Sequence, residues 1–414
     1  MSEWLLYTRA ALLKGGNAAF FVFRVFFGFL PPRLRVCFSM ALVKFQTENF
    51  RNLSSAPVSF SPSFNLLYGE NGSGKTSVLE AIGYLGLGRS FRVNRHQAVV
   101  SHGQQRLTVF GGLDHGLEEN DRGNDSELVH RLGISRDVGQ KETVLRVDGE
   151  AVRSLSGLAK HLPVSVIDPG VFDVITGGPG KRRQFLDWLV FHVEPSFGSL
   201  WQQCQRVTSQ RNQTLRNGRL DEALMRVWDH QYTTLSERIT EARADTFGRF
   251  KAAFEKLVRE VEVPWTEGLK LEYYPGWDVS RPLAELLADH REQERKVGHT
   301  LYGPNRADIR LKFQGRPVAE TFSRGQQKTL VILMKIAQGM VLSDLGKQVT
   351  FLLDDINAEL DEGHRAMLAS RLQALRCQVF ITSIERPLVG QLWPGGNAPD
   401  YRLFHVEHGK LTEE

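Results

Sequence analysis

Short apolar runs that end in glycine, acid or hydroxyl residues recur near both ends of the chain, and they predict buried β-strands. Phe64–Tyr68, Thr350–Leu353 and Val379–Ser383 all have this character, and Ala41–Phe45 also has a strand-like pattern. The middle of the chain differs, because apolar residues there recur at spacings of three and four, which predicts an amphipathic helix. Its expected apolar face consists of Leu224, Trp228, Leu235, Ile239, Ala242, Phe250, Phe254 and Leu257. The pattern therefore predicts an α/β fold with a helical insert.

Composition narrows this picture only slightly. A chain of 414 residues is long enough for a sizeable core and for two lobes. Its net charge of +5 fits a nucleic-acid partner, although many other soluble proteins share such a balance. Cys37, Cys204 and Cys377 are too far apart for a disulfide framework or a metal site, which favours a reduced, cytoplasmic protein. The twelve histidines show no metal-ligand spacing either.

The first 39 residues differ from the rest. Ala18–Leu30 is apolar and rich in Phe, but Arg24 interrupts it, and it is shorter than the roughly 20 residues that span a bilayer. No small-residue cleavage site follows, which argues against a signal peptide. We expect Met40 to be the biological start and residues 1–39 to be a non-native or disordered extension; a membrane-touching tail is the alternative.

A glycine-rich loop follows the strand Phe64–Tyr68 and precedes a helix-like segment, Val78–Ile82. Glycines let backbone N–H groups surround a phosphate, and the new helix directs its positive end at the same anion. The pattern is that of a P-loop, so Lys75 is expected on the β- and γ-phosphates of ATP and the Thr76 hydroxyl on Mg²⁺. The expected nucleotide-binding residues here are Gly69, Glu70, Asn71, Gly72, Ser73, Gly74, Lys75, Thr76 and Ser77.

Two carboxylates follow the strand Thr350–Leu353, as in a Walker B motif. Asp354 is expected to hold Mg²⁺, and Asp355 to orient or deprotonate the attacking water. Together with Lys75 they form the expected catalytic set. A strand that ends in two solvated acids is the plainer interpretation of this segment alone.

Ser323–Gln326 fits a helix capping box, since an apolar helix follows it. It also resembles the signature motif of ATP-binding-cassette ATPases, in which such a helix end contacts the γ-phosphate held by another subunit. Ser323, Gly325 and Gln326 are therefore expected to contact ATP. The 31 residues from Ser323 to Asp354 leave room for a helix of about twenty.

Two further segments resemble parts of the same superfamily. Asn357–Asp361 resembles its D-loop. Thr382 or Ser383 ends the strand at the position of the residue that senses the γ-phosphate, which is often His in cassette ATPases, so the sensor is left open between the two.

The insert between Lys75 and Ser323 is about 250 residues, without sustained heptads. It is too short for the coiled coils of structural-maintenance proteins and Rad50, and longer than the insert of transporter ATPases. We expect an ABC-ATPase-like P-loop lobe with mixed sheets and an inserted helical arm. The expected divisions are residues 1–39 (extension), 40–180 (first ATPase part), 181–300 (arm) and 301–414 (second ATPase part).

From about Met40 onward the chain resembles the RecF family of bacterial recombination-repair proteins. The resemblance rests on Phe50–Leu53, the P-loop, Gly177–Pro179 with Arg182–Trp188, Gly303–Asp308, Ser323–Gln326 and Asp354–Asp355. Asn305 stands where the family commonly has His, and the first 39 residues have no family counterpart.

The resemblance implies an ATP-dependent homodimer that clamps DNA at single-strand gaps or junctions and hydrolyses ATP slowly. ATP on Gly69–Ser77 of one subunit would be closed over by the signature of the other. It also implies work with RecO and RecR to load RecA in DNA repair, replication restart and SOS induction, with no membrane partner.

Basic residues offer candidate contacts to DNA phosphates. They are Arg89, Arg92, Arg95, Lys181, Arg182 and Arg183. Each has an alternative as a solvated charge or a local ion-pair partner. No base-reading motif is present, so we expect binding to depend on salt.

Three other functions remain open at this stage. The chain could be an ATP-gated DNA scaffold without significant hydrolysis, although Asp354 and Asp355 favour at least slow turnover. It could be a transporter ATPase subunit, against which the RecF-type motifs argue. It could be a small-molecule kinase, in which Ser323–Gln326 would have no role.

Overall fold

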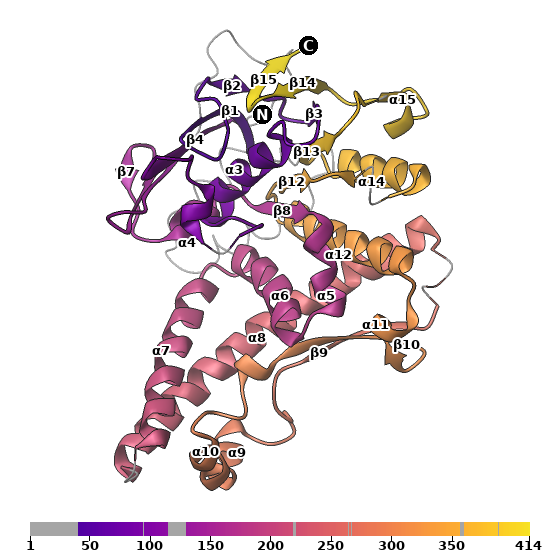
Figure 1. The fold of residues 1–414 in the computed structure, drawn as a ribbon. Helices are drawn as coiled ribbons and strands as arrows, with labels where there is room; N and C mark the ends of the chain where they lie inside the picture. Colours follow the sequence, from indigo (N-terminus) through magenta and orange to yellow (C-terminus); the bar gives the residue numbers. More distant parts are fainter. Residues whose placement is uncertain are drawn as a thin grey trace, which may run out of the picture. The chain divides into compact units, whose positions relative to one another are not determined.

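The computed structural model of the protein describes residues 40–93, 95–114, 130–217, 221–263, 265, 267–356, 360–387 and 389–414. The expected extension at residues 1–39 lies outside them and stays a prediction. The named strands of the described part form three sheets (Figure 1).

A mostly parallel sheet contains three of the four strands that the apolar runs predict, whereas the fourth, at Ala41–Phe45, lies in a separate antiparallel sheet. The order of the mostly parallel sheet is β15-β14-β3-β13-β12-β8, and only β15 is antiparallel. The strands are β3 (Phe64–Tyr68), β8 (Val164–Ile167), β12 (Thr350–Leu353), β13 (Gln378–Ser383), β14 (Tyr401–Glu407) and β15 (Lys410–Glu413). Leu66 packs into one core and Leu67 into another, so the sheet is buried on both faces, which explains its continuous apolar runs.

An antiparallel sheet covers the helix that follows the P-loop. Its order is β2-β1-β4-β5-β6-β7. The strands are β1 (Ala41–Glu48), β2 (Val58–Ser59), β4 (Arg106–Asp114), β5 (His130–Asp137), β6 (Glu142–Val147) and β7 (Glu150–Ala151). Helix α3 (Lys75–Leu87) contacts both this sheet and the parallel one. Gly86 permits the close approach, because a Cβ there would lie 2.4 Å from Cγ2 of Val164.

Long helices form the middle of the chain. They are α6 (Pro179–Val193), α7 (Phe197–Arg216) and α8 (Glu222–Val261), with the shorter α9 (Leu283–Asp289) and α10 (Arg291–Val297). Helix α8 packs along α7 and also against α12 (Arg324–Asp344) (Figure 1). Its 40 residues make it about 60 Å long at 1.5 Å per residue.

The predicted apolar face of α8 is wrong at its start. Leu224 is 40% exposed, whereas Met225 is fully buried. The buried face runs through Met225, Tyr232 and Ile239, so Leu224 lies about 100° away from it around the helix. The Asn-Gly pair at residues 217 and 218, a sequence typical of a turn, falls partly outside the described residues.

A third sheet and several helices complete the fold. Strands β11 (Arg316–Pro317), β10 (Asp308–Phe313) and β9 (Leu269–Tyr274) form the sheet in this order. Strand β10 lies in the expected second ATPase part and pairs with β9 of the expected arm, and the proposed divisions at residues 180 and 300 stay predictions. The other helices are α4 (Leu155–Ala159), α5 (Asp173–Thr176), α11 (Val318–Thr321), α14 (Glu362–Ala374) and α15 (Val389–Leu392), with 3₁₀ turns at His96–Val99, Pro169–Phe172 and Pro304–Arg306. Among the described residues we find no helix with the length and apolarity needed to cross a membrane.

Candidate nucleotide site

The carboxyl ends of four parallel strands meet at one edge of the sheet. The end of β3 at Tyr68 pairs with Ser383 of β13, and Leu353 of β12 pairs with Ile381. The Asp354 amide continues this ladder by donating to the Ile167 carbonyl at 2.9 Å. Such edges commonly hold ligands in α/β proteins, and here they bring the P-loop beside both acids.

The P-loop has the backbone conformation that its glycines predict. Gly69, Gly72 and Gly74 all have positive φ, and a Cβ on Gly69 would lie 2.3 Å from the Val406 carbonyl oxygen. Lys75 begins α3, three residues before the predicted helical segment, and its Nζ donates to the carbonyls of Gly69 (2.7 Å) and Glu70 (2.8 Å). The lysine thus folds back over the loop that would surround a phosphate.

Residues from outside the motif support the loop. The Gly409 amide, in the turn between β14 and β15, donates to the Ser73 carbonyl at 2.7 Å. Asn52 accepts from the Ser77 hydroxyl at 3.1 Å. In the sequence, Asn52 stands out only within the family-like segment Phe50–Leu53, and no local pattern links Gly409, near the far end of the chain, to this loop.

Asp354 stands at the centre of the expected catalytic set. Its Oδ1 accepts from the hydroxyls of Thr76 and Thr382, both at 2.9 Å. The Thr382 hydroxyl also accepts from the Asp355 amide at 2.8 Å, whereas the Ser383 hydroxyl donates to the Glu385 carbonyl at 2.6 Å. Of the two expected sensors, Thr382 is therefore the one in contact with both acids.

Burial perturbs the charges of the site. It raises the pKa of Asp354, and the hydrogen bonds from Thr382 and Thr76 oppose this change. Burial lowers the pKa of Lys75 against the attraction of Asp355 and Asp354. The field of Arg92 also lowers the pKa of the Asp354 carboxyl. Lys75 and Asp354 therefore lie in a partly desolvated site. Their hydrogen bonds and neighbouring charges do not fully offset the effect of burial on their pKa values.

The donor set around Thr76 and Asp354 fits Mg²⁺, which prefers oxygen ligands and completes its shell with water and substrate phosphates. The hydroxyl oxygen and the carboxylate oxygen lie 2.9 Å apart, close enough to belong to one coordination shell. No cluster of three His, Cys, Asp or Glu side chains suited to a metal occurs among the described residues. A metal here would therefore need the phosphates as well.

The capping box at Ser323 is confirmed. The Ser323 hydroxyl accepts from the Gln326 amide at 3.3 Å, and the Gln326 side chain accepts from the Ser323 amide at 2.9 Å. Ser323, Arg324 and Gly325 are exposed. Across the described ranges no hydrogen bond or ion pair joins this helix end to the P-loop, so its contact with nucleotide stays a prediction.

The expected D-loop is only partly described. Asn357, Ala358 and Glu359 lie outside the described residues, whereas Leu360 is buried. Asp361 caps α14 by accepting from the His364 amide at 2.9 Å.

The candidate DNA contacts divide into two groups. Arg89, Arg92 and Arg95 are exposed. Arg182 instead forms a two-pronged ion pair with Asp308 (2.7 and 3.0 Å), so the ion-pair alternative holds for it. The other two members of that run are also engaged, because Arg183 donates to the Ala307 carbonyl at 2.8 Å and Lys181 pairs with Asp173 at 2.9 Å.

Known proteins resemble the chain over nearly its whole described length. The family model described as RecF/RecN/SMC N terminal domain matches residues 41–407. "DNA replication and repair protein RecF" of Marinobacter nauticus is 76% identical over 375 residues, which cover 91% of this chain and 100% of the relative. The protein of the same name from Pseudomonas syringae pv. tomato is 43% identical over 90% of this chain and 98% of its own.

Solved structures share the fold. One titled "Structure of the recombination mediator protein RecF-ATP in RecFOR pathway" superposes with a TM-score of 0.78 at 23% identity, over 91% of this chain and 98% of its own. An Smc head bound to the C-winged helix domain of ScpA superposes at 0.53 with 14% identity, over 90% and 97%. Their low identity restricts this likeness to architecture, which is the ABC-ATPase-like lobe with a helical insert that the sequence predicts.

Proposed function

The chain belongs to the RecF family of DNA replication and repair proteins, and from this premise we propose that it is an ATP-gated clamp on DNA. Two copies would enclose ATP between the P-loop of one and the signature helix of the other. The clamp would close on DNA at single-strand gaps or junctions in the cytoplasm and open after slow hydrolysis.

The separation between the two halves of the nucleotide site carries this proposal. The P-loop, Asp354 and Thr382 are joined by hydrogen bonds at one sheet edge. Ser323 and Gly325 lie exposed at the start of α12. A helix N-terminus is a good anion site because its amides carry partial positive charge, so this exposed end suits the phosphate held by a second copy.

Each residue of the site has a role in the proposed reaction. The P-loop amides and Lys75 bind the phosphates, and Thr76 and Asp354 hold Mg²⁺, which when bound neutralises phosphate charge. Asp355 orients and deprotonates the attacking water, and Thr382 holds Asp355 by its backbone amide. Ser323, Gly325 and Gln326 of the second copy complete the γ-phosphate contacts, so ATP binding and dimerisation must strengthen each other.

The proposal extends to partners. The DNA contacts would be made to phosphates by exposed arginines such as Arg89 and Arg95, without base recognition. RecR would be a direct partner, and RecO and RecA would act downstream. The likeness of the chain to a relative solved as a recombination mediator in the RecFOR pathway supports this extension.

Sedimentation of complementary variants tests the clamp. Lys75→Met removes the phosphate contact, and Ser323→Arg blocks the signature. Each variant alone should stay monomeric with ATP, because both sites of its homodimer are defective. An equal mixture should form heterodimers, since one P-loop and one signature remain intact in the same pair, and these should retain a gapped duplex that neither variant retains alone.

The wild type with and without ATP is the control for these mixtures. ATP-dependent dimerisation of Lys75→Met alone, or no rescue in the mixture, would show that the two motifs do not form one shared site. In that case Ser323–Gln326 would be only the helix cap that its hydrogen bonds describe.

A further inference from the structure

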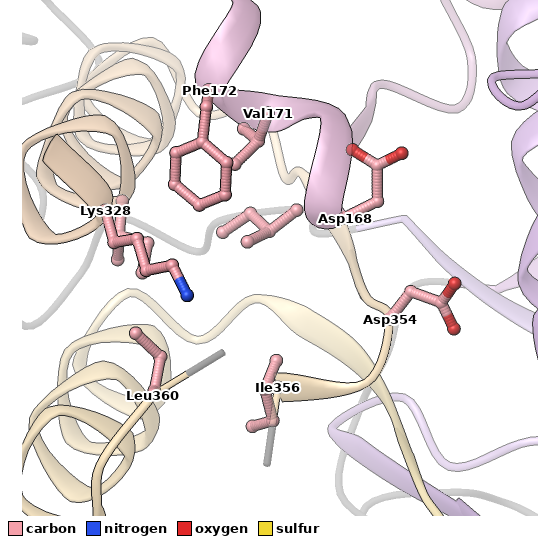
Figure 2. A pocket seen from close by; sticks show the side chains of 9 residues that line it. Asp168, Val171, Phe172, Lys328, Asp354, Ile356 and Leu360 are labelled. Atoms are coloured by element: carbon pink, nitrogen blue, oxygen red, sulfur yellow. The ribbon is translucent and has the colours of Figure 1, made fainter. Parts of the chain in front are cut away.

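The arm contains a hollow that lies outside the nucleotide site. It lies between the C-terminal turns of α8 and strand β9 and has about 420 Å³ of space. The hollow beside Asp354, with Lys328 on its opposite side, is much smaller (Figure 2). Its space of about 10 Å³ holds roughly one water molecule. Of the two, only the α8–β9 hollow has room for part of another molecule.

Side chains from α8 and from the start of the third sheet line the α8–β9 hollow. The lining residues are Lys251, Phe254, Glu255, Val258 and Arg259 of α8, then Glu267 and residues 269–272. Phe254, Val258 and Leu271 are buried and supply its apolar surface. No residue of β10, which the structure describes completely, lines it. The hollow therefore lies at the edge of β9 that faces away from β10.

The backbone of β9 leaves hydrogen-bonding groups open at this edge. The Gln314 amide donates to the Gly268 carbonyl at 3.1 Å, so these two opposite residues form a hydrogen-bonded pair. Such pairs alternate along an antiparallel ladder, so Lys270 and Glu272 also direct their backbone groups at β10. The N–H and C=O groups that point the other way belong to Leu269, Leu271 and Tyr273. Within the described ranges no group forms a hydrogen bond with them.

An open edge of this kind is a template for a further strand, because an extended chain can complete each bond. The opposite edge of the sheet is blunted, since β11 has only two residues and one of them, Pro317, has no N–H. Strand β9 has six residues and no proline, and it extends for about 20 Å. A nucleic acid carries no alternating N–H and C=O groups at strand spacing, so this edge favours a polypeptide.

The charges around the hollow favour an acidic polypeptide. Four of them largely offset one another in two ion pairs, at 3.9 Å and 3.2 Å, which are Lys251–Glu255 and Lys312–Glu272. Arg259 and Lys270 are exposed, and neither forms an ion pair with a residue that the structure describes. Glu267 is the acid of the lining that lacks such a pair. Two unpaired cations therefore face one unpaired acid, and an acidic segment would supply the missing charge.

We propose that the α8–β9 hollow is a docking site for an extended, acidic segment of a partner protein, which adds to β9 as a further strand. Its apolar side chains would pack on Phe254 and Val258, and its acidic side chains would lie near Lys270 and Arg259. The backbone ladder supplies affinity, and the alternation of apolar and acidic side chains supplies specificity. This surface requires no nucleotide, so the inference goes beyond the proposed clamp and does not depend on it.

Fluorescence anisotropy with a designed peptide tests docking on the full chain. The probe is a fluorescein-labelled peptide of about eight residues that alternates valine and glutamate, long enough to cover β9. Arg259→Glu and Lys270→Glu should each weaken its binding about tenfold, because each replaces an attractive charge with a repulsive one. Two further peptides carry N-methyl groups on alternate amides, one on the valines and one on the glutamates. Their affinities should differ at least about tenfold, because only one set of amides faces β9.

Hydrogen exchange of individual amides shows whether a strand is added. Exchange at Leu269, Leu271 and Tyr273 should slow about tenfold or more when the peptide binds. Exchange at Lys270 and Glu272 should be slow with and without peptide, because these amides already donate to β10. Attraction between charges alone would not produce this alternation.

Matched controls separate the site from general charge. Lys256→Glu makes the same charge reversal on α8, but Lys256 lines another hollow, with Met340 and Asp344. The affinity of this variant for the peptide should stay within about twofold of the wild type. A peptide that alternates valine and lysine should bind at least about tenfold more weakly than the glutamate peptide.

The contrary outcomes are distinct. Equal affinities of the two methylated peptides, or unchanged exchange at Leu269, Leu271 and Tyr273, would overturn strand addition. Absence of saturable binding up to about 1 mM peptide would overturn the site itself. Tighter binding of a single-stranded oligonucleotide, lost in Arg259→Glu, would make this a nucleic-acid surface instead. Self-association without ATP that Lys270→Glu abolishes would assign the edge to a second copy of the chain.

Discussion

Buried charges occur in two regions of this protein, and they are satisfied in different ways. In the arm, the fully buried Arg211 and Glu294 meet at 2.6 Å, and Arg211 also binds Asp229 at 2.8 Å. Arg243, also fully buried, forms a two-pronged pair with Asp187 at 2.8 and 2.9 Å. Each of these arginines has its countercharge within the chain.

The nucleotide site differs on this point. Lys75 and Asp354 are each only 9% exposed, yet Lys75 donates to backbone carbonyls and Asp354 accepts from hydroxyls. In the part of the chain that the structure describes, neither forms an ion pair within 4 Å. A buried charge costs free energy unless it is paired, so one left unpaired is expected where a ligand supplies the countercharge. An ion pair within the chain therefore marks a buried charge that stabilises the fold, whereas a buried charge without one marks a site where a substrate binds.

Breaking a completed pair should have the largest effect. Arg211→Met leaves the buried carboxylate of Glu294 without its countercharge, and such changes cost about 3–5 kcal/mol of unfolding free energy. Urea denaturation measures the loss, and ATP affinity should stay within about threefold of the wild type. Arg249→Met, on the exposed side of α8, should cost less than about 0.5 kcal/mol. A loss below about 1 kcal/mol for Arg211→Met would contradict the structural role assigned to this pair.

The corresponding change at Lys75 should have the opposite profile. Lys75→Met removes a cation that has no ionic partner in the chain, so unfolding free energy should change by less than about 1 kcal/mol. ATP affinity should fall about 100-fold, or about 2.8 kcal/mol, because the phosphates lose their charged donor. Calorimetry and denaturation on the same preparation measure both. A large stability loss with little change in affinity would assign Lys75 to the fold.

This contrast explains what the sequence could predict. The nucleotide half of the site consists of contiguous motifs after buried strands, so the P-loop, Asp354 and the capped helix at Ser323 follow from local pattern alone. The sequence does not distinguish Thr382 from Ser383 as the sensor, because only tertiary hydrogen bonds to Asp354 and Asp355 set Thr382 apart.

The arm was less predictable for a physical reason. Periodicity identified α8 but counted only apolar residues, so it missed Tyr232 and Arg243, which are fully buried because distant partners satisfy their polar atoms. For the same reason the sequence predicts Arg182 as a DNA contact, because its ion-pair partner Asp308 is 126 residues away along the chain. Long-range pairing cannot be read from local composition.

A buried base that has neither a countercharge in the chain nor a ligand to supply one should remain neutral. His192 is such a base. Burial lowers its pKa to about 3. The unfolded chain binds a proton near pH 6.5 and the native chain does not, so stability is lost as pH falls from about 6.5 towards 3. The slope should reach about 1.4 kcal/mol per pH unit.

Denaturation midpoints at several pH values test this expectation. His192→Leu should remove that part of the slope, whereas His230→Gln, at an exposed position on α8, should not. An unchanged slope in His192→Leu would mean that His192 is protonated in the native protein and has an acceptor after all.

The smallest expected effect is on DNA affinity, which should fall on substitution of arginines without an ion pair and not of arginines that already have one. Arg89 and Arg95 are exposed and make no ion pair among the described residues, whereas Arg182 is held by Asp308. Arg89→Gln and Arg95→Gln should each weaken binding to a gapped duplex about fivefold, close to 1 kcal/mol. Each should also reduce the slope of log K against log salt by about 0.9, the contribution of one phosphate contact.

Arg182→Gln supplies the matched comparison, because it makes the same chemical change at an arginine whose charge is already used. It should lower stability and leave the salt slope unchanged. Titrations across a range of salt concentrations decide between the two groups. If Arg182→Gln reduced the slope and Arg89→Gln did not, the DNA would lie against the arm, and pairing within the chain would not exclude an arginine from binding phosphate.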